Sequence, residues 1–257
     1  DFYAVRLRTK RDNLTVGYLG TYVNRPVIDR TAKVNALDFE YRPSNIRRLS
    51  GTALASDVNG EKGYGFNLGY GYDPSKNRHN GVGVFYVDED LDMKDMGYLW
   101  RNNLLMISGR ASIKQTDFSQ DSIARARKYA IGYNLKSTSD FEKEPSGFYF
   151  LAENSFTNTS EIKAEVFYRT TGRDNLITRK SALSPFINMP KGYGVELEYS
   201  GPSDDFLQYG FEVERSQGSR YSAALGWQTS YQGKVSISPA DTLSLSLFYK
   251  HGQEEDW

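Results

Sequence analysis

Apolar and polar residues alternate with a period of two through most of this chain. Successive side chains of a strand point to opposite faces, so the pattern predicts β-strands with one apolar and one polar face. The clearest rows cover residues 64–72, 128–135, 193–200, 207–214, 221–228 and 243–250. About 15 such segments of roughly 8–15 residues, separated by turn sequences such as Asn59-Gly60 and Asn80-Gly81, indicate an antiparallel all-β chain.

The ends of the apolar rows are rich in aromatic residues, mainly tyrosine. A soluble β-sandwich also alternates, but aromatic girdles at both water interfaces are typical of a membrane barrel. The candidate girdle residues are Tyr64, Tyr72, Tyr193, Tyr199, Tyr221 and Trp227. The segments are long enough for tilted strands, which need about 9–11 residues to cross a bilayer. The sequence therefore predicts an antiparallel up-and-down transmembrane β-barrel with about 14–16 strands in this chain, and a soluble sandwich or barrel is the alternative.

Composition narrows the chemistry that the chain supports. Its 257 residues include no cysteine, which excludes disulfides, thiolate metal sites and a thiol nucleophile. Lys plus Arg and Asp plus Glu both number 32, so no charge excess points to nucleic acid. No apolar run approaches the ~20 residues of a membrane-spanning helix. The chain is hydrophilic on average, which a membrane barrel also is, because only alternate strand residues face lipid.

Charged residues on the polar rows form a basic group and an acidic group. The basic candidates are Arg6, Arg8, Arg48, Arg110, Lys114 and Lys128. The acidic candidates are Glu161, Glu165, Glu196, Glu198, Glu212 and Glu214, with Lys163 interrupting them. If both groups line a lumen, we expect a transverse field that orients polar solutes and sets selectivity. The alternative is ion pairing between neighbouring strands that fills a plugged barrel.

The sequence offers no convincing catalytic or metal site. His79 lies in a predicted hairpin turn and His251 at a predicted strand end, so we expect two exposed loop histidines rather than a Ser-His pair. The residues Asp88, Asp90, Asp92 and Asp95 contain ligands suited to Ca²⁺, but they lack the spacing of an EF-hand loop and predict an exposed acidic loop. We therefore predict no catalytic residue, no metal and no cofactor. A group at Arg125, Arg127 and Lys128 is a candidate contact for lipopolysaccharide phosphates.

Two stretches lack clean alternation. Residues 170–191 contain two prolines and predict a long loop that folds inward or covers the mouth of the barrel. Residues 88–102 are similar, with acidic residues ahead of an aromatic run. At the C-terminus, Trp257 resembles the terminal aromatic of an outer-membrane barrel, but the polar residues 253–256 before it predict a turn or an artificial end instead of a last strand.

Several segments resemble one family of outer-membrane β-barrels of unassigned function. They are NLTVGYLGT (13–21), NALDFEYRPS (35–44), LDMKDMGYLWRNN (91–103), TRKSALSPFINMP (178–190) and ISPADTLSL (237–245). The resemblance covers nearly the whole chain, with departures at Lys94 and at Lys180-Ser181. Members of this family usually carry an N-terminal domain like the family-9 carbohydrate-binding modules.

The resemblance implies that residues 1–257 form a single barrel domain cut from a longer one at both ends. We expect a bacterial outer-membrane protein in contact with lipid and lipopolysaccharide, acting as a channel or translocation pore for polar solutes or glycans. A binding domain outside this chain, or another partner protein, would work with it. The alternatives are a plugged barrel that anchors a surface carbohydrate-binding module, and an outer-membrane hydrolase.

Overall fold

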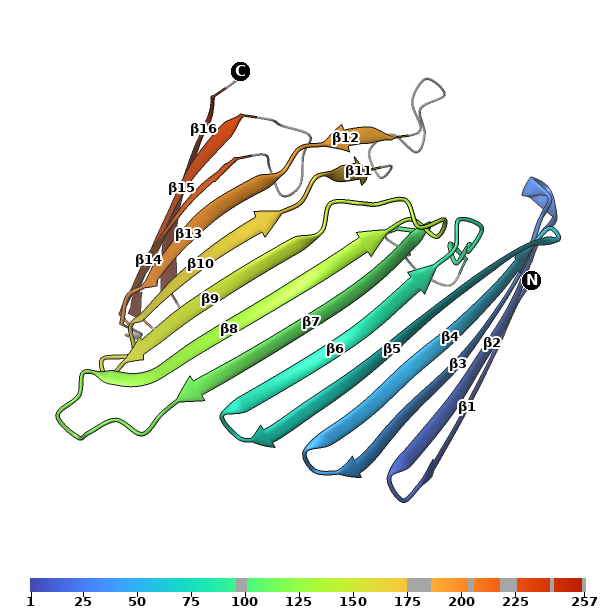
Figure 1. The fold of residues 1–257 in the computed structure, drawn as a ribbon, viewed down its shortest axis with the longest axis horizontal. Coiled ribbons are helices and arrows are strands. Elements are labelled where there is room, and N and C mark those ends of the chain that lie inside the picture. The colour runs from blue at the N-terminus through green and yellow to red at the C-terminus, as the bar shows by residue number, and fades with distance from the viewer. Residues whose placement is uncertain (96–100, 175–185, 203–205, 218–225, 241–242, 256–257) are drawn as a thin grey trace. The chain divides into compact units, whose positions relative to one another are not determined.

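The computed structural model describes residues 1–95, 101–174, 186–202, 206–217, 226–240 and 243–255 (Figure 1). Fourteen strands follow one another in a single antiparallel order that keeps the order of the chain. This confirms the predicted all-β, up-and-down architecture. The strands are β1 (Phe2–Arg11), β2 (Leu14–Arg25), β3 (Arg30–Ser44), β4 (Arg47–Val58), β5 (Glu61–Ser75), β6 (Arg78–Val87), β7 (Leu104–Gln115), β8 (Ala124–Ser137), β9 (Gly147–Phe156), β10 (Glu161–Arg169), β13 (Gly192–Ser200), β14 (Leu207–Gln217), β15 (Trp227–Ala240) and β16 (Leu243–Glu255).

Three short elements lie outside this order. The 3-10 helix η1 (Pro26–Ile28) joins β2 to β3. The strands β11 (Gly172–Asp174) and β12 (Ile187–Met189) pair with each other inside the predicted loop 170–191. Among the described residues, no helix is long and apolar enough to cross a membrane.

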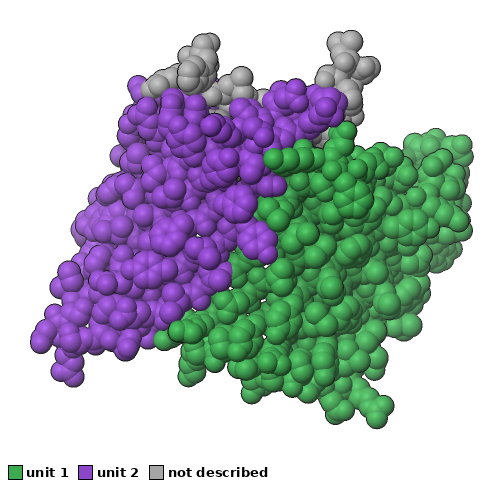
Figure 2. Space-filling model, in the orientation of Figure 1, with its two compact units in different colours: residues 1–110, 134–144 green, residues 111–133, 145–257 purple. Residues whose placement is uncertain are grey.

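The chain divides into two compact units (Figure 2). Unit 1 contains residues 1–110 and 134–144, and unit 2 contains residues 111–133 and 145–257. Side chains alternate between an apolar and a polar face along each strand. The register places side chains of one kind opposite each other, so neighbouring strands share these two faces.

The apolar face of unit 2 is largely exposed. In one row across the strands, Ala164 of β10 pairs with Leu197, which pairs with Val213 and then with Tyr231. Leu197 is 49% exposed, and its neighbours on the same face, Val166 and Phe211, are 54% and 53% exposed. A soluble sheet would bury these side chains, since full burial of each one stabilises by about 1.5–3 kcal/mol.

Unit 1 shows the same inverted arrangement. On β5, Phe66 and Leu68 are exposed, while Gly63 and Gly65 on the opposite face are buried. The hydrophobic core of this unit therefore lies on the polar face, near the end of β5 that follows the Asn59-Gly60 turn. Its most buried members are Val34, Val87, Leu91 and Leu104.

The connections differ in length. The links after β1, β3, β4 and β5 span residues 12–13, 45–46, 59–60 and 76–77. The links after β6, β7, β8 and β10 span residues 88–103, 116–123, 138–146 and 170–191. Alternate connections of an up-and-down sheet lie at opposite ends, so length alone does not separate the two ends of the strands.

Local sequence signals were reliable at one turn and misleading at another. Asn59 and Gly60 form the β4–β5 turn with φ values of 53° and 94°, the left-handed conformations that such a pair adopts readily. Asn80-Gly81, predicted as a turn, lies inside β6, where Gly81 pairs with Gly71. The turn falls instead at residues 76–77.

The turn predicted for the C-terminal polar run is wrong for residues 253–255. Residues 253–255 continue β16, with Gln253 opposite Thr229 and Glu254 opposite Gln228. Gln228 also donates a hydrogen bond of 2.6 Å to Glu254. The backbone ladder needs no alternation when the partner side chains are polar, so the pattern of side chains hid the strand. Trp257 lies outside the described residues.

Candidate functional site

Lys163 lies at the centre of the acidic group on the polar face of unit 2. Its Nζ is 2.9 Å from Glu196 Oε1 and 3.1 Å from Glu198 Oε2. Lys163 comes from β10 and the two glutamates from β13, so one cation joins neighbouring strands through two carboxylates. A single lysine therefore contacts both acidic residues of this part of β13, and its one positive charge compensates only one of the two carboxylates.

The register places the other carboxylates of this face opposite each other. Glu165 pairs with Glu196, and Glu196 pairs in turn with Glu214. In the adjacent row, Glu198 pairs with Glu212. Directly opposed like charges destabilise a sheet by a few tenths of a kcal/mol to about 1 kcal/mol per pair.

Local pairing accounts for two of the remaining candidates in unit 2. Lys128 of β8 lies 2.9 Å from Glu153 of β9. Glu161 accepts a hydrogen bond of 3.3 Å from the Ser155 hydroxyl. Lys114 lies on β7 in alternation with the exposed Ile113. Pairing between neighbouring strands is thus present on the polar face of this unit, and segregation of charge between two walls stays a prediction.

In unit 1, acidic partners accompany the predicted basic residues. Arg6 is 2.7 Å from Asp38, and Arg48 is 3.8 Å from Glu40. Arg8 lies on the same face, opposite Gly17. Arg110 lies on β7, on the face opposite to that of Ile107. The basic side proposed from sequence therefore contains Asp38 and Glu40, which sequence reasoning did not place there.

A second feature of unit 1 is the segment 88–95, which leaves β6 and packs onto the polar face of β3, β4 and β5. Asp88 accepts hydrogen bonds from the backbone N–H groups of Tyr64, at 2.6 Å, and Leu91, at 2.8 Å. Leu91 is only 2% exposed. The prediction of an exposed acidic loop was wrong for Asp88, Asp92 and Asp95, which have partners on neighbouring strands, whereas Asp90 is exposed as predicted.

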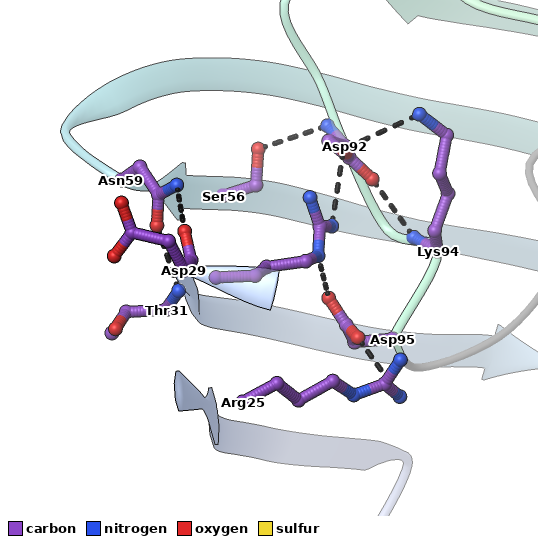
Figure 3. A network of polar contacts seen from close by, with 9 residues as sticks. Arg25, Asp29, Thr31, Ser56, Asn59, Asp92, Lys94 and Asp95 are labelled. Carbon is purple, nitrogen blue, oxygen red and sulfur yellow. Dashed lines mark hydrogen bonds and ion pairs between the residues drawn. The ribbon is translucent and has the colours of Figure 1, made fainter. Parts of the chain in front are cut away.

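Arg30 contacts the distal part of this segment, and Figure 3 shows Asp92 and Asp95 of the segment together with Arg25 and Ser56. Its guanidinium is 2.6 Å from Asp95 and 3.1 Å from Asp92. Arg25 adds a 3.0 Å contact to Asp95, whose side chain is 3% exposed. The Asp92 N–H donates to the Ser56 hydroxyl at 3.1 Å. Two arginines and one hydroxyl from β2, β3 and β4 thus fix the segment, and none of the three is near it in sequence.

Gly63 lets the segment 88–95 pack closely against β5. A Cβ at this position would lie 2.2 Å from the Leu91 backbone nitrogen and 2.3 Å from its Cα. The close approach of the two backbones therefore requires glycine. Elsewhere in unit 1, Arg101 and Glu144 form an ion pair in which both side chains are almost completely buried. The described parts of the long connections of unit 1 therefore contain buried side chains.

Burial by itself would raise the pKa of Asp92, but the Lys94 N–H and the Arg30 guanidinium outweigh it and lower the pKa below its ordinary value. A carboxyl with a lowered folded-state pKa stabilises the fold above its unfolded pKa of about 3.9, and this contribution disappears as the pH falls through the folded value. We expect amide exchange in residues 88–95 to accelerate below about pH 4 relative to other loops. Equal protection at neutral pH and at about pH 3 would contradict this role of Asp92.

The described girdle candidates lie at the ends of apolar rows. Tyr193 contacts Trp227 edge-to-face at 5.3 Å between ring centroids. At the other end of β13, Tyr199 contacts Phe211 at 5.4 Å. Tyr64 is exposed on β5, and Tyr72 lies near the opposite end of that strand with Arg47 over its ring. Tyr221 lies outside the described residues.

The remaining candidates are dispersed. Arg127 donates to Asn154 at 2.9 Å and lies on the face opposite Lys128, so the predicted basic group 125–128 is divided between two faces. His251 was wrongly predicted to lie in a loop. It belongs to β16 and stacks with Tyr231 and Tyr249 at 6.5 Å. His79 lies 3.1 Å from Asp73 beside the 76–77 turn.

Comparison with known proteins identifies a family and a fold. The family model described as a domain of unknown function (DUF5916) matches residues 8–256. No curated protein matches the chain. A solved structure named "Bacterial polysaccharide outer membrane secretin" is similar, with a TM-score of 0.52, 15% identity, and coverage of 99% of this chain and 83% of that one. This likeness shows that the fold is that of an outer-membrane β-barrel protein.

A further solved structure, "CymD monoaromatic hydrocarbon channel", has a TM-score of 0.33, 8% identity, and coverage of 98% and 77%. This likeness is too low to support an argument. The family match agrees with the resemblance seen in the sequence, which named a family of unassigned function.

Proposed function

We propose that this chain, which belongs to the DUF5916 family, forms part of an outer-membrane channel or translocation pore for polar solutes, with glycans among them. The observation that carries the proposal is the inverted arrangement of the strands. Leu197 and Phe211 are exposed on one face, while Lys163 and Glu196 are more sheltered on the other. Lipid satisfies the first face and an aqueous lumen the second.

The acidic rows give the lumen a preference for cations. The surplus of carboxylates around Lys163 attracts positive charge and repels anions along the polar face of unit 2. The secretin that shares the fold is named for a polysaccharide, which supports a glycan as one transported class. A carbohydrate-binding domain outside this chain would deliver such a solute.

Conductance of the full-length protein in planar bilayers tests the proposal. We expect stepwise ion currents with a reversal potential that favours cations. Replacing Glu196 and Glu198 by glutamine removes two charges and moves the reversal potential toward that of an unselective pore. The matched control is Glu61→Gln, which removes an exposed carboxylate beside the β4–β5 turn. The absence of current from correctly folded protein would contradict the pore.

A plugged barrel that anchors a binding module is the second candidate. The observation that favours it is the segment 88–95, whose Leu91 and Asp95 are buried on the polar face of unit 1. A plug predicts that the wild-type protein is closed and that release of this segment opens it. The single-channel current of a Gly63→Ala variant, which is expected to release the segment, separates the two candidates.

A further inference from the structure

A hollow of about 380 Å³ opens among the last four strands of unit 2. Gly210 is one of the residues that line it, and it pairs with Ser200 on one side and with Lys234 on the other. A Cβ there would lie 2.9 Å from the Tyr199 carbonyl oxygen, so the backbone leaves no room for a side chain at this position. The volume of the hollow is in the range of small-molecule sites. Glu198, Glu212, Gln232, Lys234 and Phe248 border the hollow.

The polar border offers both kinds of hydrogen-bonding group. Glu198 and Glu212 present carboxylate acceptors, Lys234 presents a donor, and the Gln232 amide presents both. Gln232 donates to Glu212 at 3.2 Å, a long contact that leaves Glu212 with further acceptor capacity. Hydroxyl groups, which donate and accept, match this mixture better than a purely ionic ligand does.

The charge around the hollow is only partly balanced. Lys163 contacts Glu198 at 3.1 Å, and Lys234, which pairs with Gly210, also borders the hollow. A neutral ligand adds no charge to this border, so its entry does not require an ion to leave water.

Phe248 adds an apolar surface. It is 61% exposed, and it stands on the polar row of β16 between Ser246 and Lys250. An aromatic ring beside carboxylates and an amide suits a pyranose ring, whose C–H face packs on the phenyl while its hydroxyls reach the polar border. From these observations we propose that the hollow beside Gly210 is a binding subsite for a neutral glycan, an inference that rests on the proposed function and names its solute.

Blockade of single-channel current by neutral hexasaccharides tests the subsite. With maltohexaose or cellohexaose added to the full-length protein, we expect transient blockades of the ion current. Phe248→Ala and Gln232→Leu should each shorten the blockade by about tenfold, the loss of one good contact. Gln228→Leu is the matched control, because Gln228 lies on the same face of β15 but bonds Glu254 outside the hollow. Two variants are used so that a folding defect in one does not decide the result.

The outcomes separate the subsite from the pore. Currents that neither hexasaccharide blocks, or equal blockade in wild type and both variants, would overturn the subsite and leave the pore intact. Blockade by spermidine but by neither sugar would show a cation site and would also overturn it. If the protein carries no current, calorimetric titration of the same sugars in detergent decides. Binding that is lost in Phe248→Ala supports the subsite although the pore has failed, and no binding overturns both.

Discussion

Replacing Leu197 by arginine is expected to destabilise the folded protein in a lipid bilayer by about 2–4 kcal/mol, because the guanidinium would enter the hydrocarbon. Leu197 lies in the middle of β13, and its row partners Ala164 and Val213 are also on the apolar face. In a soluble protein, an arginine at a half-exposed position would change stability by less than about 0.5 kcal/mol. The measurement is denaturant unfolding from liposomes of the full-length protein.

The matched control for this change is Ser230→Arg. Ser230 lies on the polar face of β15, directly opposite Glu214 of β14. An arginine there enters water and gains a carboxylate partner, so we expect a change below about 1 kcal/mol. Equal effects of the two arginines would contradict the assignment of the faces.

Replacing Gly63 by alanine is expected to release the segment 88–95. The new Cβ would collide with backbone atoms of Asp90 and Leu91, at 2.2–2.3 Å, and backbone does not move away as a flexible side chain does. Release exposes the Leu91 side chain and separates Arg30 from Asp92 and Asp95. The loss of stability should be about 2–4 kcal/mol, from the lost burial together with the broken ion pairs.

Gly69→Ala is the matched control, because Gly69 lies on the same face of β5 and its nearest neighbour would be Ser50 Oγ at 3.8 Å. We expect it to change stability by less than about 0.5 kcal/mol. Thermal unfolding and single-channel current are measured for both variants. A current that appears only in Gly63→Ala identifies the segment as a plug, and a current that merely increases identifies it as a constriction. Equal stability of the two variants would show that the segment 88–95 does not pack against Gly63.

The strands could be predicted from the sequence because lipid-facing side chains repeat with the period of the backbone. The rows 193–200 and 207–214 correspond to β13 and most of β14, and their apolar members are exposed as a membrane strand requires. The prediction failed where side chains and backbone disagree. Polar residues 253–255 continue β16 without alternating, and His251 sits among aromatic rings.

The packing of the segment 88–95 against Gly63 and its partners could not have been predicted from local patterns. Its partners Arg30 and Ser56 are distant in sequence, and Gly63 resembles any other glycine in a strand. An acidic stretch with Asp92 and Asp95 is exposed in most proteins, so only the three-dimensional arrangement reveals the arginines that compensate it. The acidic rows were visible in the sequence, but their direct opposition, Glu196 to Glu214 and Glu198 to Glu212, depends on the register.

The most direct test of the central claim uses single cysteines on one strand, since residues 1–257 contain none. Spin labels are placed at Val195, Glu196, Leu197 and Glu198 of the full-length protein in liposomes, and their collisions with oxygen and with a water-soluble nickel chelate are measured. We predict alternation: oxygen dominates at positions 195 and 197, and the chelate dominates at 196 and 198. Chelate access at all four positions, or the opposite alternation, would contradict a strand with one face in lipid and the other in water.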